Sequence, residues 1–462
     1  MLYLLALLWH FYWASTVSAP GDWDPAYYLS VARHIAEGDG AVTDAVWNLG
    51  WLPPELRHAA DLHWMPLPSR VLVPFVSLAP RNPWPATQLC ACLLAAGWAP
   101  LAWFWAARLE ASTAIRWCAG LIAVSAGGYV RTVTTPDSIA LYGLLGGAAF
   151  LAASQRLSIT LALVAAVAVT RGDGFILGIA AALAWPGRRG WPVALAGLGA
   201  FAAWSMRCWI VGGEGWLGMR ARVAGSLRLS EILTTSEPHV PTVVERFAFM
   251  VQHVPSMLTV AFIVSGGVLI WPALLEWLKR RQDRGLWPLL AYALCFPPII
   301  HMLVPAIAAE GSVYRSGAAL FVPMCALGAV GAGNLTKRYH PWFLPGTLVV
   351  AAFVSSALMG RKYEEVRLPG LADCEALSMV PKGEPLLSYD PVGVEARCGY
   401  PGAIMARGAD LAPLVEQYGF KWALAAPADF ENGTVRAAEF PLKGWTRVGE
   451  RVFRREGRPE AH

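Results

Sequence analysis

Long apolar runs separated by short polar connections fill most of the first 360 residues. A run of about 20 apolar residues is long enough to cross a bilayer as a helix. The expected spans after residue 80 are Trp84–Ala107, Ala114–Val130, Ser138–Ala153, Leu157–Thr170, Gly174–Trp185, Trp191–Val211, Pro255–Leu278, Leu286–Ala308, Ser316–Leu335 and Pro341–Met359. The fourth and fifth are short, so each is either a crossing or a helix that stops inside the protein.

The first 19 residues form another apolar run. A cleaved signal peptide is the alternative, because Val17, Ser18 and Ala19 are small or short side chains. No Lys or Arg precedes the run, however, and Pro20 would follow the cut, so we expect a retained anchor. With it, the pattern predicts about eleven spans.

The composition agrees with this pattern. Hydrophobic residues make up 56% of the chain and charged residues 15%, whereas soluble domains have about 25% charged residues. The formal net charge of +5 suits loops beside anionic lipid headgroups better than a nucleic-acid surface. We therefore expect a polytopic membrane protein that contacts membrane lipids and binds no nucleic acid.

Basic residues in the connections predict the orientation. If the spans alternate, Arg108, Arg156, Arg188, Lys279 and Lys337 all lie on the same side. The positive-inside rule makes that side the cytoplasm. The loops 22–70 and 212–254 and the tail 361–462 then lie outside.

The first outer loop, residues 21–70, contains several predicted elements. Pro25–Glu37 has the spacing of an amphipathic helix, and a second short helix is expected near Pro54–Asp61. The prolines in His63-Trp64-Met65-Pro66-Leu67-Pro68 predict a rigid, extended return to the membrane. Trp and Tyr side chains here are typical of a membrane interface.

The last hundred residues have a different pattern, so we expect two domains, 1–360 and 361–462. In the second, Pro385–Asp390 and Trp422–Ala426 have the pattern of strands, and Leu411–Tyr418 that of a helix. These elements predict a small α/β domain. Its two cysteines, Cys374 and Cys398, form either a disulfide, which an extracytoplasmic position favours, or two buried thiols.

Polar groups at the outer ends of spans are the candidates for chemistry, because charges near the membrane interior are costly. Asp24, followed by Pro25, is either a helix cap alone or a functional carboxylate, and Asp137 offers the same pair of interpretations. Arg171 and Asp173 are either a structural ion pair or part of a site. Arg315 either pairs with Glu310 or binds phosphate oxygens.

Further candidates surround these residues: Asp22, which with Asp24 could hold a divalent metal, and Tyr28, His63, Arg131 and Tyr314 as substrate-binding side chains. A structural role is the alternative for His63. The sequence has no P-loop, no GxGxxG after a strand, no HExxH and no CxxC. A donor carried by a lipid requires none of these motifs.

The order of these features resembles the GT-C superfamily of integral membrane glycosyltransferases, which includes protein O-mannosyltransferases and the aminoarabinose transferase that modifies lipid A. Asp24-Pro25-Ala26-Tyr27-Tyr28 is similar to the family's Asp-Glu-Ala-x-Tyr motif, except that proline replaces the second acidic residue. The other matching segments are Thr135-Pro136-Asp137-Ser138, Thr170-Arg171-Gly172-Asp173-Gly174, and Tyr314-Arg315 with Pro323. The tail matches no member of the family.

This resemblance implies a multi-span helical bundle on the bacterial inner membrane, with its active site and tail on the periplasmic side. It also implies transfer of a sugar from a polyprenyl-phosphate donor to a lipid, glycan or protein acceptor, with inversion at the sugar. Asp24 would be the base, Asp137 or Asp22 would orient the acceptor or bind a metal, and Arg315, with Arg131 or Arg171, would stabilise the phosphate.

Three other functions remain as alternatives. A polysaccharide polymerase or ligase would use arginines in a late outer loop, for which Arg220, Arg222 and Arg228 are available. A transporter or flippase of lipid-linked sugars would carry charges near mid-span and internal repeats, and no convincing repeat is found. A scaffold without catalysis would bind its partners through the tail.

Overall fold

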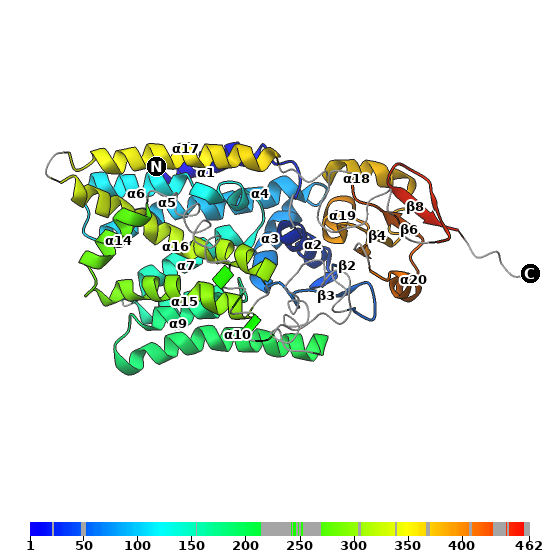
Figure 1. The fold of residues 1–462 in the computed structure, drawn as a ribbon, viewed down its shortest axis with the longest axis horizontal. Helices are drawn as coiled ribbons and strands as arrows, with labels where there is room; N and C mark the ends of the chain where they lie inside the picture. Colours follow the sequence, from blue (N-terminus) through cyan, green and yellow to red (C-terminus); the bar gives the residue numbers. More distant parts are fainter. Residues whose placement is uncertain are drawn as a thin grey trace, which may run out of the picture.

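The structure is a computed structural model in which long helices lie side by side and a smaller part with a β-sheet sits at one end of them (Figure 1). It describes residues 1–20, 23–47, 52–153, 155–213, 269–303, 306–337, 340–365, 370–405, 409–427 and 443–456, with isolated positions at 440 and between 242 and 252. The predicted fold class, a mainly α-helical membrane bundle with a small C-terminal sheet, is confirmed.

The helices of the bundle follow most of the predicted spans. They are α1 (Leu2–Ala14), α4 (Pro83–Ala96), α5 (Trp98–Arg108), α6 (Thr113–Val124), α7 (Ser138–Ala152), α8 (Leu157–Ala168), α9 (Gly174–Ala182), α10 (Gly190–Gly212), α14 (Ile270–Lys279), α15 (Trp287–Leu303), α16 (Ala306–Leu335) and α17 (Phe343–Glu365). Short 3-10 turns at Gly127–Tyr129, Thr132–Thr134, Gly187–Arg189, Arg284–Leu286 and Leu377–Met379 join or extend helices.

Among the described residues, four stretches are long and apolar enough to cross a membrane: Pro83–Arg108, Gly187–Gly212, Val313–Leu335 and Phe343–Arg361. Four shorter apolar helices accompany them: α1, α3 (Pro66–Leu78), α7 and α8. Most of the predicted span Pro255–Leu278 and of the loop 212–254 lies outside the described residues.

The centre of the bundle is held by tryptophans that reach across to small residues. The indole Nε1 of Trp98 donates to the carbonyl of Ala140 at 3.0 Å, and that of Trp105 donates to Gly147 at 3.0 Å. A Cβ at Gly143 would lie 2.3 Å from the Trp98 ring. Because small residues let helices approach closely, α5 and α7 pack tightly here, and this packing fixes the position at which α7 begins.

The connections at one end of the bundle touch one another. Arg108, at the end of α5, forms an ion pair of 3.3 Å with Asp283, and Arg280 donates to the carbonyl of Leu109 at 2.9 Å. The predicted alternation of spans requires these two basic connections to share a side, and the contact agrees with it.

Two predictions about the first outer loop are wrong. The prolines at 66 and 68 do not extend the chain but lie in the first turn of α3, where a missing N–H costs nothing and the fixed φ suits a helix. The short helix expected near Pro54–Asp61 is replaced by bends and β3 (His58–Ala59), which pairs antiparallel with β1 (Val42–Thr43). The predicted amphipathic helix is present as α2 (Trp23–Glu37).

The sheet at the other end has six strands in the order β2-β5-β4-β6-β8-β7. The parallel part comprises β2 (Ala45–Val46), β5 (Gly402–Ile404), β4 (Leu386–Ser388) and β6 (Trp422–Leu424), and β8 (Val452–Arg455) and β7 (Trp445–Arg447) add antiparallel strands. The helices beside it are α18 (Gly370–Ala376), α19 (Pro391–Cys398) and α20 (Ala412–Tyr418). Because β2 comes from the first outer loop, this loop and the tail form one sheet.

Cys374 and Cys398 form a disulfide that joins α18 to α19, so the disulfide alternative is confirmed. The neighbouring Asp373 is buried and pairs with Arg397 at 3.1 Å and with Arg451 at 2.9 Å. The cross-link and the ion pairs therefore hold the same two helices against the sheet.

Replacing both cysteines of this disulfide with serine is expected to lower the free energy of unfolding of the C-terminal part by about 2–4 kcal/mol, because the unfolded chain regains the freedom of a closed loop. The midpoint of thermal unfolding in one detergent, followed by tryptophan fluorescence, would report this loss. The control is Cys295→Ser, which changes an exposed free thiol. Equal midpoints for the double variant and the control would contradict the prediction.

Candidate functional site

The first turn of α2 places Asp24 against two other segments of the chain. The indole Nε1 of Trp64 donates to its Oδ1 at 2.8 Å. Its Oδ2 lies 3.3 Å from Nε of Arg315, and the Asp24 side chain is 15% exposed. The carboxylate is thus held from both sides by distant residues while part of it remains accessible to solvent.

Asp137 is the N-cap of α7 and also faces the same arginine. Its Oδ1 accepts hydrogen bonds from the backbone N–H of Ile139 at 3.2 Å and from the Ser138 hydroxyl at 3.0 Å. Its Oδ2 lies 3.4 Å from Nε of Arg315. One oxygen therefore caps the helix, as one interpretation from the sequence expected, and the other faces Arg315.

Arg315, on α16, lies between these two carboxylates and is 21% exposed. The three side chains come from α2, from the start of α7 and from α16, which are far apart in the sequence. One guanidinium facing two carboxylates leaves the cluster one negative charge in excess when both acids are ionised. A partly solvated carboxylate beside an arginine can accept a proton, and the arginine can stabilise an anion.

A second ion pair lies next to this cluster. Nε of Arg171 lies 3.1 Å from Oδ1 of Asp173 and donates to the Ser316 hydroxyl at 2.9 Å. The Ser316 hydroxyl donates to Asp173, and Nη1 of Arg171 donates to the Ser138 hydroxyl at 3.4 Å. Ser138 and Ser316, the chain neighbours of Asp137 and Arg315, thus connect the two ion pairs.

Tyr28 lies near the cluster on the buried side of α2. Burial, followed by the charges of Asp24 and Asp137, raises the pKa of its phenol well above the ordinary value. Tyr28 therefore keeps its proton at neutral pH and can donate a hydrogen bond.

Trp64 contacts Asp24, although the sequence did not single it out as a site residue. Its only signal there was its place in the aromatic segment 63–68. Tyr27 of α2 stacks on it with ring centroids 4.2 Å apart. Before it in the chain, Asp61 is fully buried and lies 2.5 Å from Nη1 of Arg70, while Trp204 of α10 donates to the Asp61 carbonyl at 3.1 Å. These contacts fix the segment so that the Trp64 indole points to Asp24.

The contacts described for three of the predicted substrate-binding residues are with residues other than Asp24, Asp137 and Arg315. Arg131 donates to the carbonyls of Gly360 and Trp13 at 2.9 and 3.2 Å, which ties α17 to α1. The hydroxyl of Tyr314 donates to the Gly128 carbonyl at 2.9 Å. His63 packs against Trp47 and Trp64, with ring centroids 4.6 and 4.8 Å away, so it lies beside the indole that binds Asp24.

Some candidates fall outside the described residues. They are Asp22, and with it the predicted metal pair of Asp22 and Asp24; the arginines 220, 222 and 228 of the polymerase or ligase alternative; and the side chain of Glu310.

Several solved structures have the same fold. ArnT from Cupriavidus metallidurans bound to undecaprenyl phosphate matches with a TM-score of 0.59 at 11% identity, over 98% of this chain and 97% of that chain. The Archaeoglobus fulgidus oligosaccharyltransferase in the apo form matches with a TM-score of 0.53 at 11% identity, over 92% of this chain and 69% of that chain. AglB from the same archaeon, in complex with an inhibitory peptide and a dolichol-phosphate, matches with a TM-score of 0.54 at 12% identity, over 92% of this chain and 68% of that chain.

No protein-family model matches the sequence, and neither does any curated protein. The structural matches confirm the resemblance predicted from the sequence: the chain has the membrane fold of the GT-C glycosyltransferases.

Proposed function

We propose that this protein transfers a sugar from a polyprenyl-phosphate carrier to an acceptor hydroxyl on the outer face of the bacterial inner membrane. The observation that carries the proposal is the convergence of Asp24 and Asp137 on Arg315. Two of the solved structures with this fold hold a lipid phosphate, undecaprenyl phosphate in ArnT and dolichol-phosphate in AglB. The basic connections support an outward-facing site.

In the proposed reaction, Asp24 takes the proton of the acceptor hydroxyl as its oxygen bonds to the anomeric carbon. The bond from that carbon to the phosphate oxygen breaks, and its electron pair leaves with the lipid phosphate, which gains negative charge beside Arg315. A direct displacement of this kind inverts the anomeric centre. Asp137 holds Arg315 in place, and Asp137 or Asp22 orients the acceptor or binds a metal.

The neighbouring ion pair of Arg171 and Asp173 supports the same step. It anchors Ser138, the neighbour of Asp137, and Ser316, the neighbour of Arg315. Tyr28 supplies a protonated hydroxyl that can bind the sugar. In this proposal, three predicted substrate-binding residues need not touch the donor. They hold the surrounding helices and the aromatic segment in position, and they are Arg131, Tyr314 and His63.

The test uses the purified protein in lipid vesicles with a panel of radiolabelled polyprenyl phosphosugars and membrane extracts as acceptor. We expect label from at least one donor to leave the lipid, and the glycosidic linkage of the product to have the inverted configuration by NMR. If every donor keeps its sugar, or if the intact lipid-linked sugar crosses the bilayer without cleavage, the proposal is contradicted.

A further inference from the structure

A histidine and two carboxylates meet where the first outer loop contacts the C-terminal part. His34 lies near the end of α2, Asp44 between β1 and β2, and Glu395 on α19. Nε2 of His34 lies 3.2 Å from Oε1 of Glu395 and 3.7 Å from Oδ2 of Asp44, and the three ligand atoms all lie within 4.8 Å of one another. The side chains of His34, Asp44 and Glu395 are 12%, 14% and 6% exposed.

These separations suit a small, tetrahedral metal ion. Zinc binds imidazole nitrogen and carboxylate oxygen at about 2.0 Å, which in a tetrahedron places ligand atoms about 3.3 Å apart. The distances from Nε2 to the two oxygens are close to that spacing. Imidazole nitrogen and carboxylate oxygen are both ligand types that zinc takes in proteins.

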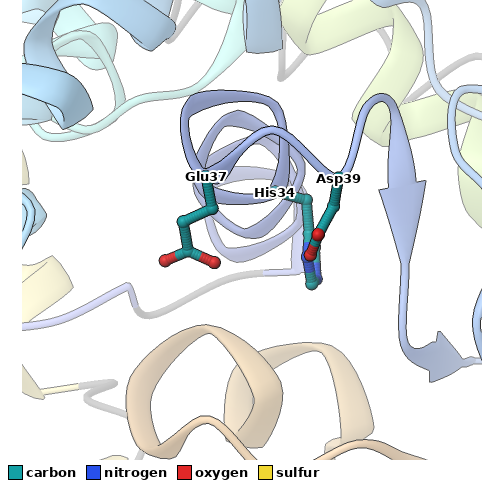
Figure 2. Close-up of side chains that lie close together, drawn as sticks. All are labelled: His34, Glu37 and Asp39. Atoms are coloured by element: carbon teal, nitrogen blue, oxygen red, sulfur yellow. The ribbon is translucent and has the colours of Figure 1, made fainter.

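The second nitrogen of the imidazole is held as in many zinc sites. Nδ1 of His34 lies 3.2 Å from Oδ2 of Asp39, and Figure 2 shows the two side chains together below the end of α2. A metal-binding histidine usually donates its other ring N–H to a carboxylate, which fixes the tautomer and the orientation of the ring. With the proton on Nδ1, the lone pair of Nε2 faces Asp44 and Glu395.

The charge around His34 favours a cation. Asp39, Asp44 and Glu395 bring three negative charges, while Arg57 donates to both oxygens of Asp44 at 2.8 and 2.9 Å and lies 3.3 Å from Asp39. Three carboxylates and one guanidinium leave two negative charges in excess.

The carboxylate of Glu395 is held in place before any ion arrives. Its Oε1 accepts hydrogen bonds from the Ser30 hydroxyl at 2.6 Å and from the backbone N–H of Asp44 at 3.0 Å. Its Oε2 accepts one from the Thr43 hydroxyl at 3.3 Å. These three bonds hold the carboxylate in one orientation.

We propose that His34 Nε2, Asp44 and Glu395 bind one zinc ion, which clamps the first outer loop to α19. Asp39 orients the imidazole from its other side. His34 lies ten residues after Asp24 on α2, about 15 Å along a helix, so this site is separate from the Asp24 cluster. The clamp fixes the helix whose first turn carries Asp24.

A second group, at the end of α2 and in the turn after it, provides the control. His34, Glu37 and Asp39 also lie close enough to share an ion, and Figure 2 shows Glu37 on the same side of α2. Glu37 and Asp39 are exposed. Because Nδ1 already faces Asp39, our proposal assigns the ion to Nε2 and no ligand role to Glu37.

The test uses the full-length protein in nanodiscs, stripped with a chelator and then dialysed against zinc, with bound metal counted by mass spectrometry. We expect one zinc per chain and a higher melting temperature with zinc than without. We expect His34→Gln and Glu395→Gln to weaken binding by more than about 100-fold, Asp39→Asn by about 10- to 100-fold, and Glu37→Gln to bind like the parent.

The melting temperature without zinc reports whether each variant is folded, so lost binding is not confused with misfolding. Cobalt serves as a second probe, because the visible absorption of its complex reports tetrahedral nitrogen and oxygen ligands. The proposal is overturned if the parent binds no more zinc than empty nanodiscs, if the His34 and Glu395 variants bind like the parent, or if Glu37→Gln loses the metal.

Discussion

Replacing Asp24 with asparagine is expected to slow sugar transfer by about 10²- to 10⁴-fold, the usual contribution of a positioned general base. Asparagine has nearly the same shape, and its carbonyl oxygen can still accept the hydrogen bond that Trp64 donates to Asp24 at 2.8 Å. It cannot take a proton from the acceptor, however. The loss should therefore fall on the turnover number and leave the KM for the lipid donor within a few-fold of the parent.

The matched control for this substitution is Asp410→Asn, which makes the same chemical change at an exposed position in the C-terminal part. Initial rates with a labelled polyprenyl phosphosugar, measured in one batch of vesicles for each protein, provide the comparison. The assignment of Asp24 as the base would be wrong if both variants turned over alike.

Replacing Arg315 with glutamine is expected to lower the rate by about 10²- to 10³-fold, as the loss of one preorganised donor to a developing anion does. Two effects act together. The leaving phosphate loses its cation, and Asp24 and Asp137, which lie 3.3 and 3.4 Å from Nε of Arg315, lose the charge that they share. Arg315→Lys keeps the charge but lacks the planar guanidinium, so its rate should lie between those of the parent and of Arg315→Gln.

Arg455→Gln, at an exposed position on β8, is the control for this change. The donor KM is measured as well as the turnover number, because a cation that binds the lipid phosphate in both ground and transition states raises KM, whereas one that acts only as the phosphate leaves lowers the turnover number. A glutamine variant with parent values for both parameters would exclude Arg315 from the site.

Much of the helical framework was predictable from the sequence because the helices repeat one simple pattern. The predicted start of a span at Ser138 coincides with the start of α7, and the expected helix Pro25–Glu37 falls within α2. In both cases an Asp stands where the helix begins, just before the apolar or amphipathic run. Local signals of this kind require no knowledge of distant contacts.

One error occurred where proline has two possible meanings. Pro66 and Pro68 were interpreted as extended chain, yet both lie in the first turn of α3. Proline restricts φ to values that suit extended chain and the first turn of a helix equally well. What decides between them is packing of α3 against α2 and α4, which no local pattern reports.

The candidate site was only partly predictable for the same reason. Asp24, Asp137 and Arg315 were singled out one by one, because charges at the ends of apolar spans are unusual. Their neighbours Ser138 and Ser316 are ordinary helix residues in the sequence and gain importance only from their hydrogen bonds to Arg171. The pairing of β2 with β5 places Ala45 beside Gly402, and a contact between such distant residues has no local signature.

The most direct measurement of the central claim is a single-turnover experiment on a bound donor. The parent and Asp24→Asn proteins are loaded with the same labelled polyprenyl phosphosugar, the bound lipid is counted in each, and excess acceptor is then added. Our account predicts similar amounts of bound donor and a transfer rate at least about 100-fold lower for the variant. Transfer of the bound sugar by Asp24→Asn at the parent rate would contradict it.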